Sequence, residues 1–132
     1  MGLSNLKSNI AELAVATECS KKHWVVCFPH GENTPYDLLV DTNTEILKVQ
    51  VKYIALNNNT LPIRFTSSTG IEYKNTVDVI AIYCPDNSKV YWVLLKDQII
   101  DSNKTGINLR MTPTKNNQNV GVKFAEDYLL RV

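Results

Sequence analysis

The stretch PYDLLVDTNTEILKVQVKY, residues 35–53, contains two strand-like runs separated by the turn-prone residues DTNTE. In the second run, residues 45–53, apolar side chains occupy every other position from Leu47 to Tyr53. Lys48, Gln50 and Lys52 fill the positions between them, and a strand with a period of two sends these three to the opposite face. The stretch therefore predicts a β-hairpin whose second arm carries Gln50 and Lys52 side by side on a polar face.

The first arm of this hairpin, residues 36–41, contains Asp37, and a carboxylate is a poor fit inside a strand. A staggered hairpin or a bend brings Asp37 towards Gln50, because neighbouring strands lie about 4.8 Å apart. Taken singly, Asp37 is typical of a turn or cap carboxylate and Lys52 of a solvated strand lysine. Only their combination on adjacent arms indicates a site.

The rest of the chain predicts an α+β domain. Residues 3–19 form an expected amphipathic helix, with Ser4 near its N-cap and a helical stripe of Leu6, Ile10, Leu13 and Thr17. Glu12 lies off that stripe, at the expected rim of the contact between helix and sheet, where a solvated glutamate is the simpler interpretation. Further strands are expected at residues 24–28 and 61–65, the latter weakened by Pro62, and a second hairpin at residues 77–84 and 89–95.

Residues 108–130 are polar and are expected to be mostly loop, with a short strand or helix near residues 122–130. No internal repeat or long linker divides the chain. We therefore predict a single domain over residues 1–132, in which helices flank a mixed, mainly antiparallel sheet.

The composition is that of a soluble globular protein, with 44% hydrophobic and 20% charged residues. No apolar run is long enough to cross a bilayer and the N-terminus shows no signal-peptide pattern, so we expect a cytoplasmic protein without membrane contact. Cys19, Cys27 and Cys84 are then expected to be free thiols. His23 and Cys27 lie four residues apart but lack the further ligands of a zinc site. A net charge of +1 argues against indiscriminate coating of nucleic acid.

Asp37, Gln50, Glu12 and the main-chain carbonyl of Val51 together offer a set of oxygen ligands. Hard cations such as Mg²⁺ prefer oxygen ligands in proteins. Lys52, beside them, adds a positive charge that favours hydroxide and stabilises charge developing on a phosphate. These are the parts of a metal-dependent phosphodiesterase.

With Pro35-Tyr36-Asp37 as a first half-motif and Gln50-Val51-Lys52 as a second, the chain resembles the PD-(D/E)XK nuclease superfamily. Within it, the chain is most similar to small group I intron homing endonucleases and more distantly to archaeal Holliday-junction resolvases. The segments NIAELAVA, TPYDLLVD, ILKVQVKY, TVDVIAIY and NNQNVGVKFAEDY follow in the expected order. The resemblance implies a restriction-endonuclease-like core and Mg²⁺-dependent, site-specific cleavage of double-stranded DNA that leaves 5′-phosphate and 3′-hydroxyl ends.

Gln50 departs from the family pattern, which has an acidic residue at this place. The amide oxygen can still bind a metal, but the site loses one negative charge, so metal affinity should fall unless Glu12 or another carboxylate offsets the loss. Two alternatives stay open. One is a Holliday-junction resolvase, which would cut four-way DNA without sequence preference. The other is a non-catalytic DNA-binding or assembly domain, in which Gln50 marks a lost active site.

Basic side chains supply candidates for contacts with DNA phosphates or base edges: Lys48, Arg64, Lys74, Arg110, Lys115 and Lys123. Asp78 lies in the apolar run TVDVIAIY, where it needs a buried partner, and is a candidate for a supporting role near the site. A domain of this size has little surface with which to read a long target. The resemblance therefore implies a homodimer or homotetramer, which repeats the reading surface along the DNA.

Overall fold

The computed structural model of the protein describes residues 2–31, 34–66, 73, 76–98, 105–112 and 122–131. The elements, in chain order, are α1 (Leu3–Lys21), β1 (Val25–Cys27), β2 (Leu38–Asp41), β3 (Ile46–Tyr53), β4 (Thr60–Arg64), β5 (Val79–Cys84), β6 (Lys89–Leu94), α2 (Leu95–Gln98), β7 (Gly106–Arg110), β8 (Lys123–Phe124) and the 3₁₀-helix η2 (Ala125–Tyr128).

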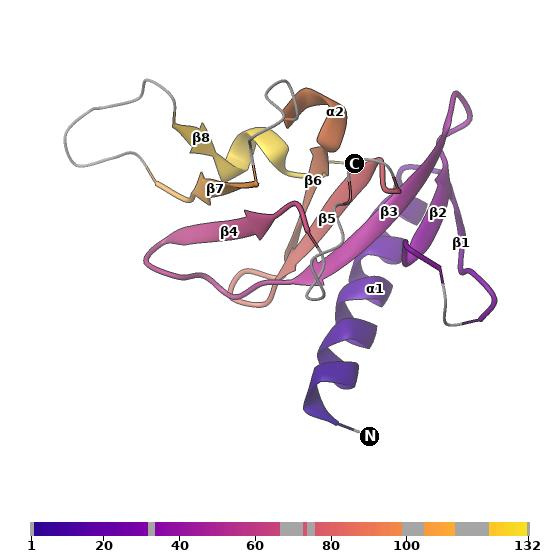
Figure 1. Ribbon diagram of the computed structural model, residues 1–132, viewed down its shortest axis with the longest axis horizontal. Helices are drawn as coiled ribbons and strands as arrows, with labels where there is room; N and C mark the ends of the chain where they lie inside the picture. Colours follow the sequence, from indigo (N-terminus) through magenta and orange to yellow (C-terminus); the bar gives the residue numbers. More distant parts are fainter. Residues whose placement is uncertain are drawn as a thin grey trace.

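Five strands form the central sheet, in the order β1-β2-β3-β5-β6 (Figure 1). The pairs β1–β2, β2–β3 and β5–β6 are antiparallel, and only β3 and β5 run parallel. The two hairpins expected from the sequence, β2–β3 and β5–β6, are confirmed with shifts of one or two residues at their ends. The fold class is confirmed as well: a small α+β domain with mixed sheets and flanking helices.

Helix α1 covers one face of this sheet (Figure 1) through the small residues Ala11, Val15 and Cys19, which are fully buried against β-strand residues such as Val49 and Val79. The predicted stripe was therefore the wrong one, because Leu6, Ile10 and Leu13 are 46%, 49% and 62% exposed. A row of small side chains lets the helix approach the sheet closely, which favours burying that row.

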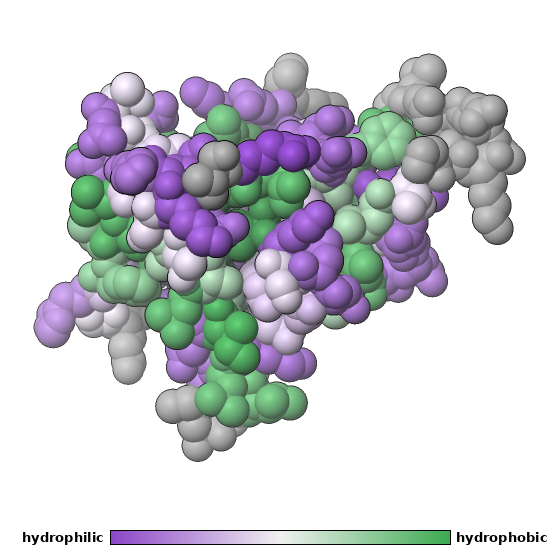
Figure 2. All heavy atoms as spheres, turned by 180° about the vertical axis from the view of Figure 1, so that it is seen from behind, coloured by the Kyte–Doolittle hydropathy of each residue, from purple (hydrophilic) through white to green (hydrophobic). Residues whose placement is uncertain are grey.

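The beginning of α1 also differs from the prediction. Gly2, not Ser4, is the N-cap residue, and no side chain caps the helix. The main-chain nitrogens of Asn5 and Leu6 donate to the carbonyl of Gly2. Hydrophobic side chains gather at the lower end of the molecule in Figure 2, where the N-terminal half of α1 projects from the sheet.

A second sheet, in the order β4-β7-β8, covers the other face of the central sheet (Figure 1). Leu61 and Ile63 of β4 and Ile107 and Leu109 of β7 alternate inwards and pack with Ile80, Ile82 and Val93 of the central sheet. Strand β7 was missed from the sequence, because its residues were included with the polar loops that follow them. Its pairing with β4 explains how a strand containing Pro62 is held: β4 is an edge strand of its sheet.

All three cysteines are free, with Cys19 and Cys84 buried and Cys27 exposed. Among the helices of the described residues, none is both long and apolar enough to span a bilayer.

Candidate active site

Asp37 lies immediately before β2 and is fixed to the main chain of β3 by two hydrogen bonds. Its own N–H donates to the carbonyl of Val49 over 2.9 Å, and the N–H of Val51 donates to its Oδ2 over 2.9 Å. Leu38 pairs with Val49 in the antiparallel register, so Asp37, one residue earlier, stands beside Gln50. The carboxylate is thus held at the point of β3 where Gln50 and Lys52 project.

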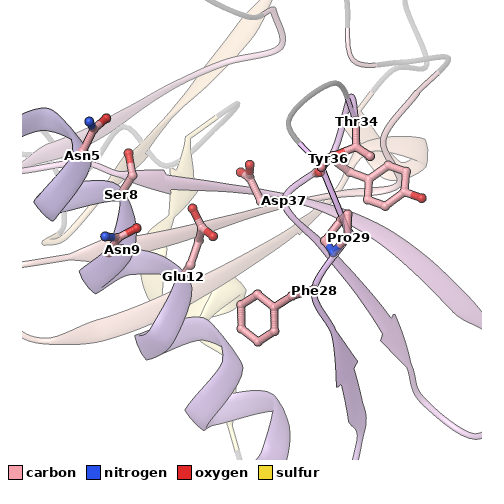
Figure 3. A pocket seen from close by; sticks show the side chains of 10 residues that line it. Asn5, Ser8, Asn9, Glu12, Phe28, Pro29, Thr34, Tyr36 and Asp37 are labelled. Carbon is pink, nitrogen blue, oxygen red and sulfur yellow. Dashed lines mark hydrogen bonds between the residues drawn. The ribbon is translucent and has the colours of Figure 1, made fainter. Parts of the chain in front are cut away.

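Glu12, on α1, faces Asp37 across a pocket of about 600 Å³ (Figure 3). Partial burial raises the pKa of Glu12, and the negative charge of Asp37 raises it further. Burial also raises the pKa of Asp37, against the opposing effects of the Val51 hydrogen bond and the Lys52 charge. Two half-buried carboxylates that destabilise each other in the ionised state form a site that a cation would stabilise.

Lys52 is half-buried on the face of β3 that carries Gln50, with its Nζ 5.1 Å from the ring centroid of Tyr73. Burial lowers the pKa of Lys52, the positive charge of Arg64 lowers it further, and Asp37 opposes both. Lys52 and Arg64 line a second pocket, of about 570 Å³, together with Lys7 of α1. Ser8 lines both pockets, so the carboxylate pocket and this cationic pocket are adjacent.

A divalent cation fits the donor set of this site, although the set is short of carboxylates. The described residues contain no cluster of three or more His, Cys, Asp or Glu side chains. Two carboxylates, those of Asp37 and Glu12, face the first pocket, and the neutral oxygens of the Gln50 amide and the Val51 carbonyl belong to the part of β3 that lies beside Asp37. Gln50 is half-buried next to Ile80 of β5 and is not among the residues that line either pocket.

A PD-(D/E)XK endonuclease family model matches residues 4–131, nearly the whole chain. The chain belongs to the PD-(D/E)XK endonuclease family. No curated protein sequence matches it significantly. Among solved structures, it is similar to the bacterial homing endonuclease I-Ssp6803I, with 24% identity, 98% of this chain and 88% of the other covered, and a TM-score of 0.71. It is also similar to Hjc, a Holliday junction resolvase from the archaeal hyperthermophile Archaeoglobus fulgidus, with 14% identity, coverage of 92% and 95%, and a TM-score of 0.53. At these identities the likenesses confirm the fold.

Asp78 is hydrogen-bonded to the main chain of Lys48 in this PD-(D/E)XK fold, and its supporting role near the site stays a prediction. It lies just before β5 and is exposed, so the expectation of a buried partner was wrong. Its Oδ2 accepts a hydrogen bond from the N–H of Lys48 over 2.8 Å, and its own N–H donates to the Lys48 carbonyl over 2.8 Å. These two bonds join Asp78 to Lys48 at the beginning of the parallel pairing of β5 with β3. Lys48 lies two residues before Gln50 in β3.

The basic candidates of this nuclease fall into separate places. Lys48 is exposed on β3, Arg64 lines the cationic pocket, and Arg110 and Lys123 together line a third pocket of about 390 Å³ beside β7. Lys74 and Lys115 lie outside the described residues. The structure thus brings Arg64 to Lys52, and Arg110 to Lys123.

Several residues of the site were missed from the sequence. Asn5, Ser8 and Asn9 line the carboxylate pocket together with Glu12 (Figure 3). Their spacing of i, i+3, i+4 and i+7 is that of one helix face, and this polar stripe on α1 is the signal that would have found them. Lys7 and Tyr73 gave no such signal, because nothing in their local sequence relates them to residues 50–52.

Proposed function

We propose that the protein is a Mg²⁺-dependent endonuclease that cleaves double-stranded DNA at specific sites, as a homing endonuclease does. The observation that carries the proposal is the position of Asp37, hydrogen-bonded to the N–H of Val51 between the half-motif residues Gln50 and Lys52 and facing Glu12. Family membership supports nuclease chemistry, and the fold likeness to a homing endonuclease supports the choice within it.

The roles of the site residues follow from their chemistry. Asp37 and Glu12, with the oxygens of Gln50 and Val51, would hold the divalent cation, which when bound supplies Lewis-acid stabilisation of charge on the phosphate. Lys52 places an ammonium beside the reacting phosphate, where it stabilises the charge that develops on the phosphate oxygens. Water attacks phosphorus, the bond to the 3′ oxygen breaks, and the products are a 5′-phosphate and a 3′-hydroxyl.

The DNA would be held by cationic residues around this site, with Lys48, Arg64, Arg110 and Lys123 as the described candidates and Lys74 and Lys115 as further ones. A homodimer or homotetramer would place two such sites on one duplex, and a symmetric pair of sites is what a double-strand break requires.

A Holliday-junction resolvase is the second candidate, favoured by the fold likeness to the archaeal enzyme. Purified protein with Mg²⁺ should be offered three substrates: a linear duplex library with randomised inserts, supercoiled plasmid and a four-way junction. Cleavage of a subset of the linear duplexes supports the homing type. Cleavage confined to the junction supports the resolvase. Binding without any cleavage supports a non-catalytic domain with Gln50 as the mark of a lost site.

An inactive variant makes the comparison specific to this site. Asp37→Asn removes the ligand charge but keeps the side-chain shape and one oxygen. It should lose cleavage of every substrate while its DNA binding in Ca²⁺ stays within about twofold of wild type. Cleavage by Asp37→Asn at the wild-type rate would show that another site, or a contaminating nuclease, cuts the DNA.

A further inference from the structure

The outer face of the second sheet carries a polar surface that none of the catalytic groups uses. In β4, Pro62 and Arg64 point outwards and are exposed, while Leu61 and Ile63 are buried. In β7, Asn108 is exposed and Arg110 is half-buried, and these two alternate with Ile107 and Leu109, which are buried on the inner face. Neither strand contains an aspartate or glutamate, so this face has the charge expected of a surface that approaches DNA.

The register of the two strands orders these side chains along a ribbon. Arg64 lies opposite Gly106 at one end, Pro62 opposite Asn108 in the middle, and Thr60 opposite Arg110 at the other end. Four residues separate the rows of Arg64 and Arg110, a distance of about 13 Å along the strands at about 3.3 Å per residue. That distance matches about four base steps of 3.4 Å along a DNA strand.

The ribbon joins the candidate active site at its Arg64 end. Arg64 and Lys52 line the same cationic pocket, so two positive charges lie together at this end of the ribbon. Asn108 and Arg110, two and four residues further along, line the third pocket. A duplex that ran along the strands from a phosphate held between Lys52 and Arg64 would pass over Asn108 and then over Arg110.

We infer that the outer face of β4 and β7 enters the major groove next to the cleaved bond, with Asn108 and Arg110 reading base edges and Arg64 holding a phosphate. The inference rests on the proposed function. The major groove, about 12 Å wide, admits a two-stranded β-ribbon. Asparagine pairs in bidentate fashion with adenine and arginine with guanine, so this face has the side chains of direct readout. Strand β8, with two residues, adds little width to the ribbon.

Pocket geometry supports the assignment of roles. Arg110 and Asn108 line one pocket of about 390 Å³ together with Lys123, so polar and cationic side chains that could meet a base edge gather at this end of the ribbon. The Nε–H of Arg110 donates a long hydrogen bond of 3.4 Å to the carbonyl of Thr112, which restrains the guanidinium at the ribbon end. Arg64, by contrast, is next to another cation, an arrangement typical of phosphate binding.

The test is the cleavage profile of single variants on the randomised duplex library in Mg²⁺, read by sequencing the cut ends. Asn108→Ala and Arg110→Ala should each relax preference at one base pair, by about 5–150-fold for the 1–3 kcal/mol that a bidentate pair contributes. The two relaxed positions should be about two base pairs apart, because the residues are two apart on one strand. Arg110→Lys should keep the salt dependence of binding and still lose the preference, since lysine lacks the bidentate fork.

Arg64→Gln should behave differently from the base-reading variants. It should weaken binding of all sequences alike and reduce the slope of log K against log salt by about 1, with an unchanged sequence profile. Lys89→Ala, an exposed lysine at the start of β6, is the matched control and should leave the profile as in wild type. Thermal unfolding of each variant verifies that the sheet is intact.

The outcomes separate the inference from the function on which it rests. If wild type cuts a subset of the library and Asn108→Ala and Arg110→Ala cut the same subset, the endonuclease stands and the ribbon is not the reading surface. If wild type cuts only four-way junctions or nothing, the site-specific function fails and the inference is overturned with it.

Discussion

Replacing Lys52 by methionine should reduce cleavage by about 10²–10³-fold while leaving the fold intact. The ammonium of Lys52 is half-buried and is restrained over the ring of Tyr73 at 5.1 Å. Consider the ammonium about 5 Å from the negative charge that develops on the reacting phosphate. At an effective dielectric constant of about 20, this interaction contributes about 3 kcal/mol, which corresponds to a rate factor of about 10². Loss of one preorganised group of this kind typically costs about 10²–10³ in rate.

The stability of Lys52→Met should be close to that of wild type. Methionine keeps much of the length and the apolar stem of lysine, and its sulfur can contact Tyr73 in place of the ammonium. Removing a cation whose pKa is lowered by burial and by Arg64 also removes an unfavourable charge from the folded state. The melting temperature should therefore stay the same or rise slightly.

The assay is single-turnover cleavage at saturating Mg²⁺, with binding to the same DNA measured in Ca²⁺. Lys89→Met, which removes an exposed lysine from the start of β6, controls for the loss of one positive charge. The cleavage rate should fall by about 10²–10³-fold in Lys52→Met and by less than about twofold in Lys89→Met. A Lys52→Met protein that binds and cuts at the wild-type rate would rule out a catalytic role for Lys52, which would then be only a solvated charge.

Further expected outcomes concern the other site residues and one strand contact. Glu12→Gln should slow cleavage yet raise the melting temperature at pH 7. A carboxyl whose pKa is raised in the folded state stabilises that state below its ordinary pKa and loses this contribution as the pH rises through the raised value. The gain should vanish below about pH 4, and a gain that persists there would point to packing as its cause. Gln50→Glu should keep activity and tighten Mg²⁺ binding measured by titration, whereas Gln50→Ala should weaken both; wild-type behaviour of the two variants would make Gln50 a bystander. Gly106→Ala should destabilise the domain by about 1–3 kcal/mol in urea unfolding, because an added Cβ would collide with the carbonyl oxygen of Ile63 on β4; unchanged stability would mean that β4 and β7 separate at little cost.

The sequence predicted the central hairpin well because the alternation of apolar and polar side chains and the turn residues between the arms both agree with the packing of the structure. The period of two in residues 46–53 matches burial on the α1 side at Leu47, Val49 and Val51, and the turn residues between the arms match the observed turn. The left-handed conformation of Asn43, with φ of 78°, is one that asparagine adopts more readily than most residues. Local pattern and tertiary packing therefore specify the same register.

Helix α1 shows where the sequence was insufficient. The helix has apolar residues on two faces, and the larger ones suggested the wrong contact. The structure buries Ala11, Val15 and Cys19, a choice that depends on how closely the helix approaches the sheet and not on hydrophobicity alone. The second sheet was missed for a related reason: β7 is stabilised by its pairing with β4, more than forty residues away, and its own residues have no strong strand preference.

The neutral Gln50 changes the charge balance of the whole site. Glu12 and Asp37 contribute two negative charges, and Lys7, Lys52 and Arg64 of the neighbouring pocket contribute three positive ones. A carboxylate at position 50 would cancel the excess of one positive charge. It would also add a third carboxylate beside Glu12 and Asp37, whose pKa values are already raised. The glutamine therefore favours the approach of a DNA phosphate at the expense of cation affinity. On this argument, wild type should bind DNA more tightly than Gln50→Glu in the absence of divalent cations, and the difference should shrink as salt screens the charges.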